Sequence, residues 1–343
     1  MTPPRAMRAY LLTGHGDLDM LEYRADYPVP VLAPEEVLIE VAACGMNNTD
    51  INTRTAWYAD GGWGGHMRFP RIQGADPVGR IAAIGDGVDR SRIGERVLVD
   101  AWIRSPDGRL DVAEYLGSER DGGYARYVAV PTTNAHLIDT GLSNIELASF
   151  PCSYGTAEHM LHRPDVTEGQ WVLVTGASGG VGNALIQLAR RRGANVIALT
   201  SKSKISDVGA IGADIVLDRA MEGLDQVIID ETGGVDVLAD VVGGESFASL
   251  FATINRGGHY TTAGAIGGPI VSLDLRTLYL RDITMHGATV LPSIVFQNLV
   301  SYIERGEIRP YIAATYPLEE LKEAQAEFMK KKHIGAFVIE IGD

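Results

Sequence analysis

Short apolar runs alternate with stretches of helical periodicity from Trp171 to about residue 291. Continuous apolar runs such as Val172-Leu173-Val174 are typical of strands that are covered on both faces. The expected strands are Trp171–Thr175, Val196–Thr200, Asp214–Leu217, Val235–Val242, Gly258–Ala263 and Ile283–Ala288, and the expected helices lie at about 180–192, 203–211, 223–231, 245–255 and 274–281. Six strands with helical crossovers predict an α/β fold with a parallel, doubly wound sheet.

The first 150 residues have a different pattern. Short β-like runs such as Val37–Val41, Gly79–Gly85 and Arg96–Val99 are separated by glycine, proline and aspartate. This spacing predicts an irregular, mostly antiparallel β domain.

The tail, residues 292–343, changes pattern again. Leu318–Lys332 has the periodicity of an amphipathic helix, and Phe337–Ile339 forms a closing strand-like run. We expect the tail to return to the first domain, so that residues 1–150 and 292–343 form one domain around a second domain of residues 151–291. The alternative is that the tail only extends the second domain.

Composition excludes several classes of protein. The 343 residues are 45% hydrophobic and 22% charged, which argues against a disordered, collagen-like or coiled-coil chain. A net charge of −14 makes nucleic acid a poor partner, and no apolar run of about 20 residues predicts a membrane span. The first residues lack the apolar core of a signal peptide. Two cysteines, Cys44 and Cys152, cannot form a disulfide framework, so we expect a reducing, cytoplasmic location.

The strongest local motif is Thr175-Gly176-Ala177-Ser178-Gly179-Gly180-Val181-Gly182, between an expected strand and an expected helix. Gly179 would let the backbone approach a diphosphate, and Gly182 would let the helix pack close to the strand. The helix N-terminus would supply unpaired amides to the phosphates. The motif therefore predicts dinucleotide binding by Ala177, Ser178, Gly179, Gly180 and Val181, and a plain tight turn is the alternative.

The residues that follow the next expected strand indicate which dinucleotide the chain binds. Thr200 is followed by Ser201, Lys202, Ser203 and Lys204, where a site for NAD would carry an acidic residue. Hydroxyls and ammonium groups suit the 2′-phosphate of NADP(H). We therefore expect Ser201, Lys202 and Lys204 to bind NADP(H), although a solvated lysine pair after a strand is the alternative.

Two further strand ends carry small residues that belong to the candidate cofactor site. Val242-Gly243 and Ala263-Gly264 end expected strands on the carboxyl side of the sheet. That side holds the ligand crevice in open α/β sheets, and the alternative is that these glycines are only turns.

Several motifs, in order and spacing, resemble the medium-chain dehydrogenase/reductase superfamily nearly end to end. The matching stretches are Ala42–Asp50, Gly74–Ile81, Gly94–Val97, Gly122–Val128, Pro151–Ala157 and Thr175–Gly182. The resemblance implies a Rossmann domain inserted into a mostly β, GroES-like catalytic domain. It also implies that Thr156 contacts the nicotinamide end of the cofactor, and that homodimers form through the strands around Gly268–Val290.

Within that family, zinc-dependent members carry three metal ligands, whose positions correspond here to Asn47, Ala75 and Cys152. One thiolate cannot hold a catalytic zinc, which needs about three protein ligands. Gly45-Met46-Asn47-Asn48-Thr49-Asp50 resembles instead the zinc-free quinone oxidoreductase branch, which uses NADPH. Two positions depart from that branch: Thr49 has the place of a proton-relay hydroxyl of zinc enzymes, and Ala336 replaces a common lysine.

The resemblance places the loop of Asn47, Thr49 and Asp50 beside the nicotinamide. Asn47 and Thr49 are candidate donors to a developing negative charge, and Asp50 is expected to fix the loop by accepting backbone hydrogen bonds. Tyr58, in a segment that leads to Gly61–Gly65, is a candidate clamp for a flat substrate. The alternatives are an ordinary capped turn for the first three residues and a mobile or loose surface segment for the last.

These observations predict an NADPH-dependent oxidoreductase that transfers hydride to a quinone, an enone or a related carbonyl electrophile without zinc. One rival is an alcohol dehydrogenase with an unusual metal site built from Cys152, Asp76 and His66. The other is a dinucleotide-binding sensor or structural protein with little catalysis.

Overall fold

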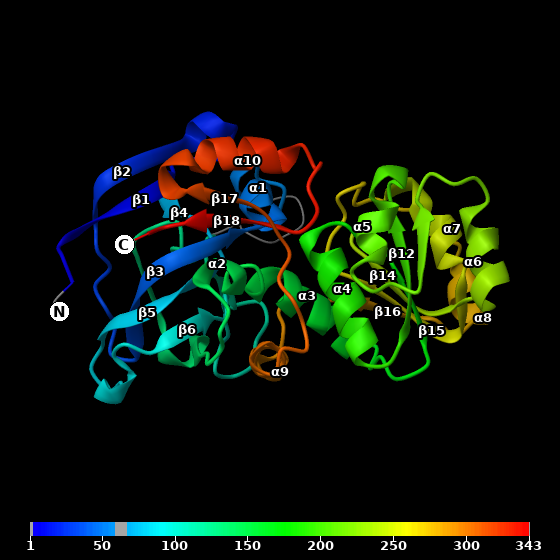
Figure 1. Ribbon diagram of the computed structural model, residues 1–343, viewed down its shortest axis with the longest axis horizontal. Coiled ribbons are helices and arrows are strands. Elements are labelled where there is room, and N and C mark those ends of the chain that lie inside the picture. Colours follow the sequence, from blue (N-terminus) through cyan, green and yellow to red (C-terminus); the bar gives the residue numbers. More distant parts are fainter. Residues whose placement is uncertain (1–2, 59–66, 343) are drawn as a thin grey trace. The chain divides into compact units, whose positions relative to one another are not determined.

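The computed structural model describes residues 3–58 and 67–342, which divide into two compact units (Figure 1). Unit 1 comprises Met1–Cys152 and Phe296–Asp343, and unit 2 comprises Ser153–Val295. The boundaries drawn from the sequence, after residue 150 and before residue 292, differ from these by two residues (152 against 150) and four residues (296 against 292). In the described part of the chain, no helix is long and apolar enough to cross a membrane.

Unit 2 contains a six-stranded sheet in the order β13-β12-β11-β14-β15-β16, and every pairing in it is parallel. Its strands are β11 (Trp171–Val174), β12 (Asn195–Thr200), β13 (Ile215–Asp218), β14 (Val235–Asp240), β15 (Ile254–Thr262) and β16 (Thr284–Gly287), and its helices are α3 (Pro151–His162), α4 (Gly180–Arg191), α5 (Ile205–Gly209), α6 (Leu224–Thr232), α7 (Phe247–Phe251) and α8 (Leu275–Leu280). The predicted doubly wound sheet is therefore confirmed.

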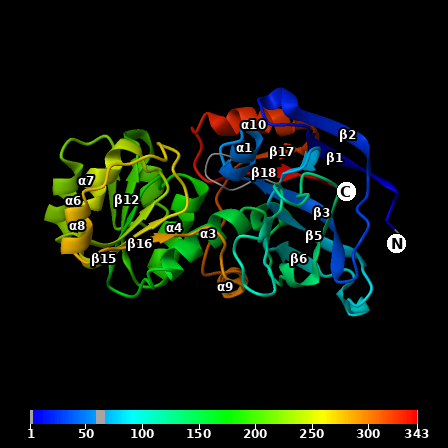
Figure 2. The ribbon, with the colours of Figure 1, turned by 180° about the vertical axis from the view of Figure 1, so that it is seen from behind.

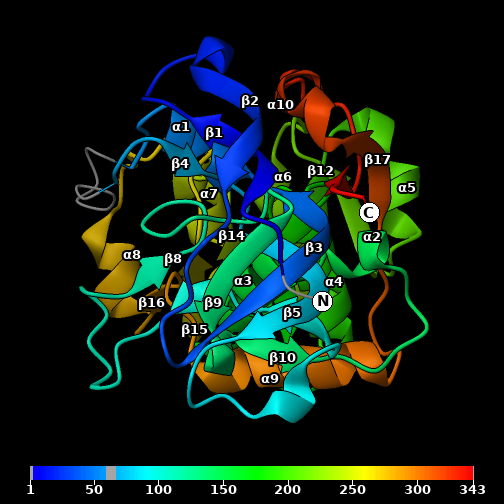
Figure 3. The ribbon, with the colours of Figure 1, turned by 90° about the vertical axis from the view of Figure 1, so that its left-hand side faces the viewer.

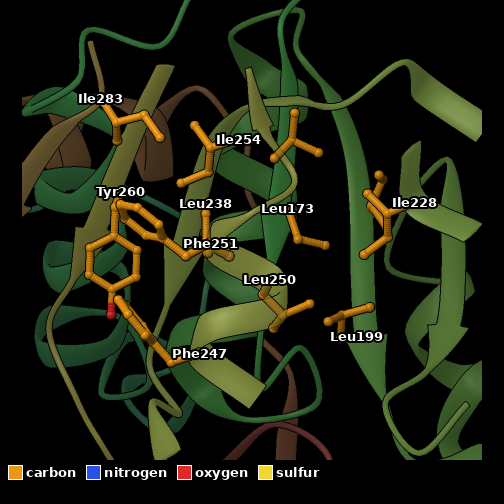
Figure 4. Close-up of a cluster of buried hydrophobic side chains, with 12 residues drawn as sticks. Leu173, Leu199, Ile228, Leu238, Phe247, Leu250, Phe251, Ile254, Tyr260 and Ile283 are labelled. Atoms are coloured by element: carbon orange, nitrogen blue, oxygen red, sulfur yellow. The ribbon is translucent and has the colours of Figure 1, made fainter. Parts of the chain in front are cut away.

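Helices cover both faces of this sheet. Figures 1 and 2 show α4 and α5 on one face and α6, α7 and α8 on the other. On the second face, Phe247 and Phe251 pack on Tyr260 of β15, with ring centroids 5.3 and 5.9 Å apart, over Leu173 and Leu238 (Figure 4). Burying a side chain of this size contributes about 1.5–3 kcal/mol, so this cluster fixes the strands whose carboxyl ends carry the candidate site.

Unit 1 is built mainly from antiparallel strands. One sheet has the order β2-β1-β4, a larger sheet has the order β10-β6-β5-β3-β18-β17 with β9 also paired to β3, and β7 pairs with β8. The strands are β1 (Ala6–Leu12), β2 (Leu21–Pro28), β3 (Glu36–Met46), β4 (Arg71–Ile72), β5 (Asp76–Ile84), β6 (Arg96–Val99), β7 (Trp102–Ile103), β8 (Glu114–Tyr115), β9 (Tyr127–Pro131), β10 (Ala135–Leu137), β17 (Ile312–Pro317) and β18 (Ala336–Glu340). The helices are α1 (Asn48–Arg54), α2 (Asn144–Leu147) and α10 (Leu321–Met329), and α9 (Ser293–Glu304) begins at the end of unit 2.

The tail belongs to this sheet, as the sequence predicted. β18 pairs antiparallel with β3, so that Phe337 lies opposite Met46 and Ile339 lies opposite Cys44. Figure 3 shows β3 in the middle of these strands, with β9 and β5 beside it. The predicted tail helix is α10, which contacts α1 through a hydrogen bond from Arg54 Nε to Gln325 Oε1 (3.0 Å).

Four helices of the described residues, α1, α2, α3 and α9, were not predicted from the sequence, and the two longest are α3 and α9. In α3, buried positions surround nearly the whole helix, so no amphipathic period marks it. In α9, the buried residues do follow a helical period, at Val295, Phe296, Leu299, Tyr302 and Ile303, so its sequence does carry the signal of an amphipathic helix.

Candidate functional site

The glycine-rich loop of unit 2 connects β11 to α4, as the motif predicted. A Cβ atom added to Gly182 would lie 2.2 Å from the carbonyl oxygen of Gly176 and 2.6 Å from the Cα of Ala177. Only glycine lets the first turn of α4 pack this closely against the loop. The predicted role of Gly182 is therefore confirmed by the packing.

Gly179, in contrast to Gly182, has open space beside its backbone. It is the N-cap of α4, no side chain caps the helix there, and an added Cβ would meet only the Gly176 oxygen at 3.5 Å. A diphosphate would fit here for two reasons. The backbone of Gly179 has open space beside it, and the N-terminus of α4 carries the positive end of the helix dipole. Gly180 also allows close packing, because a Cβ there would lie 2.4 Å from Ser153 Oγ, and its contact with a cofactor stays a prediction. The loop residues thus fit a dinucleotide, with Ala177 buried and Ser178 and Val181 partly exposed.

Basic and hydroxyl side chains gather after β12. Lys204 Nζ lies 3.4 Å from Ser178 Oγ of the glycine-rich loop, and Ser201 and Ser203 hydroxyls lie 3.4 Å apart, with Lys202 exposed beside them. Burial, and then the neighbouring Arg219, lower the pKa of Lys204. The sequence analysis missed Arg219, although it directly follows β13. Three cations and two hydroxyls beside this loop suit a dianionic phosphate.

The buried carboxylate of Asp240 forms hydrogen bonds at the carboxyl edge of the sheet. Asp240, at the end of β14, accepts hydrogen bonds from Thr175 Oγ1 (2.6 Å), from the backbone amide of Val242 (2.9 Å) and from the Tyr260 hydroxyl (3.0 Å). It thereby ties β11, β14 and β15 together where the glycine-rich loop begins. Sequence reasoning missed Asp240, because an aspartate at a strand end has no motif of its own.

The other predicted cofactor residues lie in unit 2. Val242 and Gly243 directly follow β14, and Ala263 and Gly264 follow β15, on the carboxyl side of the same parallel sheet. Thr156 is a half-buried residue of α3. Their contacts with a cofactor stay predictions.

In unit 1, Asp50 holds the start of α1. Its carboxylate accepts hydrogen bonds from the backbone amides of Asn47 (2.8 Å) and Gly74 (3.2 Å) and from the Tyr124 hydroxyl (2.9 Å). The residue is 3% exposed, and burial raises the pKa of Asp50 to about 6 in spite of these donors. These contacts match the loop-fixing role expected from the sequence.

A second buried carboxylate, Asp76, joins three segments. Its Oδ2 accepts from Asn47 Nδ2 (2.8 Å), and its Oδ1 accepts from the backbone amide of Cys152 (2.9 Å). Burial, and then the Asp50 charge, raise the pKa of Asp76 well above its ordinary value. Sequence reasoning considered Asp76 only as a substitute metal ligand, and the structure shows it to be the residue that orients the Asn47 side chain.

The side chains at the family's zinc-ligand positions do not fit zinc. Ala75 has no donor atom, the Asn47 amide is bound to Asp76, and both Asp76 oxygens accept hydrogen bonds. The Cys152 side chain hydrogen-bonds with Tyr115. Over residues 3–58 and 67–342, no group of three His, Cys, Asp or Glu side chains is placed to hold a metal ion, and His66 lies outside these ranges.

The last predicted catalytic residue, Tyr58, contacts Thr49. The Tyr58 hydroxyl accepts a hydrogen bond from Asn52 Nδ2 (3.1 Å) and also hydrogen-bonds with the Thr49 side chain. Burial raises the pKa of Tyr58, so its hydroxyl keeps its proton at neutral pH. The structure thus brings Asn47, Thr49, Asp50 and Tyr58 together around α1, whereas Gly61–Gly65 lie outside the described residues.

Two family models and several known proteins match this chain, and all of them are dehydrogenases or other oxidoreductases. Residues 33–140 match the family "Alcohol dehydrogenase GroES-like domain", and residues 180–305 match the family "Zinc-binding dehydrogenase". An alcohol dehydrogenase of Geobacillus stearothermophilus is 30% identical, with 91% of this chain and 93% of that protein covered. Human quinone oxidoreductase is 27% identical, with 94% of each chain covered.

Solved structures are similar to this chain over nearly its whole length. A candidate alcohol dehydrogenase of Sinorhizobium meliloti 1021 superimposes with a TM-score of 0.94 at 48% identity, covering 98% of this chain and 97% of that one. The 2-octenoyl-CoA carboxylase reductase CinF, solved with NADP and 2-octenoyl-CoA, gives a TM-score of 0.89 at 26% identity, covering 99% and 88%.

Proposed function

This chain belongs to the medium-chain dehydrogenase/reductase superfamily, and from that premise we propose that it is an oxidoreductase that uses NADPH, without zinc, to reduce a quinone, an enone or a related carbonyl electrophile. The observation that carries the proposal is the hydrogen bonding of Asp76. This carboxylate binds Asn47 Nδ2 and the Cys152 amide, which are groups of two residues at the family's zinc-ligand positions.

The residues of unit 2 fit a nicotinamide dinucleotide, which supplies the hydride when it is bound. The space beside Gly179 and the N-terminus of α4 would receive the diphosphate. Ser201, Lys202, Lys204 and Arg219 would receive the 2′-phosphate, which is the basis for proposing NADPH over NADH. No acidic residue stands at the end of β12 to favour NADH.

The residues of unit 1 supply polarisation and a proton. Reduction places negative charge on the carbonyl oxygen of the acceptor, and hydrogen-bond donors must stabilise that charge when no metal does. The Asn47 amide is held in one orientation by Asp76, so it is a preorganised donor. Tyr58 and Thr49 share a hydrogen bond, and this pair would deliver the proton that completes the reduction.

The test measures NADPH oxidation with a simple quinone, an alkyl enone, an aldehyde and a buffer blank, alongside metal analysis of the purified protein. We expect turnover on the quinone or the enone, slower turnover with NADH and no effect of a chelator. Stoichiometric zinc with activity lost on chelation would show a zinc-dependent alcohol dehydrogenase instead. Tight NADPH binding without turnover on any acceptor would support the sensor or structural protein.

We also propose a homodimer, because unit 2 exposes apolar side chains in the segment that leads to its edge strand β16. Ile270, Leu275 and Tyr279 are 89%, 64% and 61% exposed, and β16 ends the sheet. Two-fold pairing of β16 would cover its unpaired backbone groups. Light scattering after gel filtration should give twice the chain mass, and Ile270→Asp should reduce it to the chain mass. A wild-type chain that stays monomeric at micromolar concentration contradicts this proposal.

A further inference from the structure

The chain turns back on itself where α1 ends. Ala56, just beyond the helix, has a φ of +60°, and the backbone amide of Trp57 donates to the carbonyl oxygen of Asn52 at 2.9 Å. This is the hydrogen bonding of a Schellman motif, which ends many helices. Tyr58 follows directly, and the turn returns its side chain to the helix that carries Thr49.

The Tyr58 hydroxyl meets two polar side chains of α1. Asn52 and Thr49 share one face of this helix, because they are three residues apart. Asn52 Nδ2 donates to the Tyr58 oxygen at 3.1 Å, and the Thr49 side chain also hydrogen-bonds with Tyr58. All three side chains are partly exposed, so water or a ligand can approach the hydroxyl. The Asn47–Asp50 motif ends before Asn52, so the sequence did not indicate this residue.

The Asn52 amide fixes the direction of hydrogen bonding at Tyr58. An amide nitrogen can only donate, so it occupies a lone pair of the Tyr58 oxygen and leaves the single hydroxyl hydrogen for another acceptor. Burial raises the pKa of Tyr58, and the hydrogen bonds with Asn52 and Thr49 oppose that rise. Two further titratable groups near the hydroxyl, Cys152 and Asp50, raise this pKa through their charges. A phenol that keeps its proton while donors hold its oxygen is suited to act as an acid.

We propose that Asn52 is a positioning residue, which holds the Tyr58 hydroxyl so that its hydrogen is donated to the reduced acceptor. This inference rests on the proposed function, because it takes Tyr58 as the acid. The acceptor receives a hydride from NADPH, and negative charge develops on its carbonyl oxygen. The Tyr58 O–H bond breaks as a new O–H bond forms on that oxygen. The Tyr58 phenolate then takes a proton from water, so each reduction consumes one hydride and one solvent proton.

The test uses two variants of Asn52 and two reference variants. Asn52→Leu removes the donor, and Asn52→Asp replaces it with an acceptor of nearly the same shape. Tyr58→Phe removes the hydroxyl and sets the full size of the effect. Thr55→Val is the matched control, because the Thr55 hydroxyl lies at the same end of α1 and bonds to the backbone oxygens of Ile51 and Asn52.

The first arm measures kcat with a simple quinone and an alkyl enone, and the Kd of NADPH by fluorescence. We expect Tyr58→Phe to lower kcat about 100-fold, the contribution of a general acid, and Asn52→Leu to lower it about fivefold, the loss of one hydrogen bond. Asn52→Asp should lower kcat toward the value of Tyr58→Phe, because a carboxylate accepts the Tyr58 hydrogen. Thr55→Val should keep kcat within twofold, and every variant should keep the Kd of NADPH within twofold.

A double-mutant cycle separates positioning from a merely structural role. If Asn52 acts through the Tyr58 hydroxyl, Asn52→Leu should have no further effect on kcat once Tyr58→Phe is present. Equal fold losses with and without the hydroxyl would overturn the proposal. So would a wild-type kcat in Asn52→Asp, because the amide oxygen of Asn52 would then face the hydroxyl.

The second arm needs no turnover. Fluorine NMR of protein labelled with ring-fluorinated tyrosine follows the ionisation of Tyr58, and Tyr58→Phe identifies its signal. The Asn52 amide stabilises the phenolate, so Asn52→Leu should raise the pH midpoint of Tyr58 by about one pH unit, and Thr55→Val should leave it unchanged. An unchanged midpoint in Asn52→Leu overturns the proposal. Failure of the proposed function appears separately, as wild-type protein that reduces neither the quinone nor the enone.

Discussion

Unit 2 builds its diphosphate loop from backbone geometry within one short segment, whereas unit 1 assembles its candidate catalytic site from side chains that lie far apart in the chain. The glycine-rich loop spans Thr175–Gly182, and two glycines in it set the packing and the open space. In unit 1, Asp76 joins Asn47, 29 residues away, to Cys152, 76 residues away. The comparison teaches that binding and chemistry are specified in different ways, and changes in each unit should therefore have different effects.

The largest effect should come from Gly182→Val. The new side chain cannot fit 2.2 Å from the Gly176 oxygen, so α4 must move away from the loop. We expect unit 2 to lose about 4 kcal/mol of stability and NADPH binding to become unmeasurable. Urea unfolding and fluorescence titration check this.

The matched control for Gly182→Val is Gly209→Ala, also in a helix of unit 2. Its Cβ would meet only Val216 Cγ2, at the ordinary distance of 3.8 Å. This variant should keep both stability and NADPH binding. Equal damage from the two variants would contradict the role assigned to the loop geometry.

The second prediction concerns pH and unit 1. Burial raises the pKa of Asp50 from its ordinary 3.8 to about 6. Between pH 4 and 6 the folded state then binds more protons than the unfolded state, so the free energy of unfolding falls as pH rises and levels off above 6. The contribution is about 3 kcal/mol. Urea unfolding at pH 4 to 7 should show a smaller decrease for Asp50→Asn than for the wild type, and parallel curves would refute the prediction.

The third prediction concerns a substitution, Asp76→Asn, that should slow the reaction without weakening the binding of NADPH. Asp76→Asn leaves one acceptor for two donors, so Asn47 loses its fixed orientation. We expect kcat to fall about 30-fold, equivalent to about 2 kcal/mol, with the Kd of NADPH unchanged. Asp100→Asn is the control, because Asp100 is an equally buried carboxylate of unit 1 that pairs with Arg104. It should lower stability and leave kcat within threefold, and an equal loss of kcat in both variants would count against Asp76.

The smallest effect should come from Lys204→Met. The ammonium lies 3.4 Å from Ser178 Oγ, at the expected place of the 2′-phosphate. Its loss should raise the Kd of NADPH about tenfold, the value of one charge-assisted hydrogen bond, and leave the Kd of NADH unchanged. Arg219→Gln should also raise the Kd of NADPH and leave the Kd of NADH unchanged. If NADPH and NADH weaken alike, these cations do not select the phosphate.

The sequence by itself determined the architecture and the cofactor loop of this protein. Alternating apolar and helical segments specified the parallel sheet, because strand and helix periods are local properties of the chain. The tail helix and the strand around Phe337 were predicted in the same way. The roles of Gly179 and Gly182 were predictable because eight consecutive residues contain the whole geometry.

Only the tertiary structure decided how the candidate catalytic site is held together. Asp76 and Tyr124 reach Asn47 and Asp50 from other segments, and no local pattern marks these pairs. Arg219 and Asp240 join their sites for the same reason, since Arg219 follows β13 and Asp240 ends β14, two separate strands of one sheet. A buried hydrogen bond depends on the distance and burial of both partners, and these are fixed only when the strands have paired and the helices have packed.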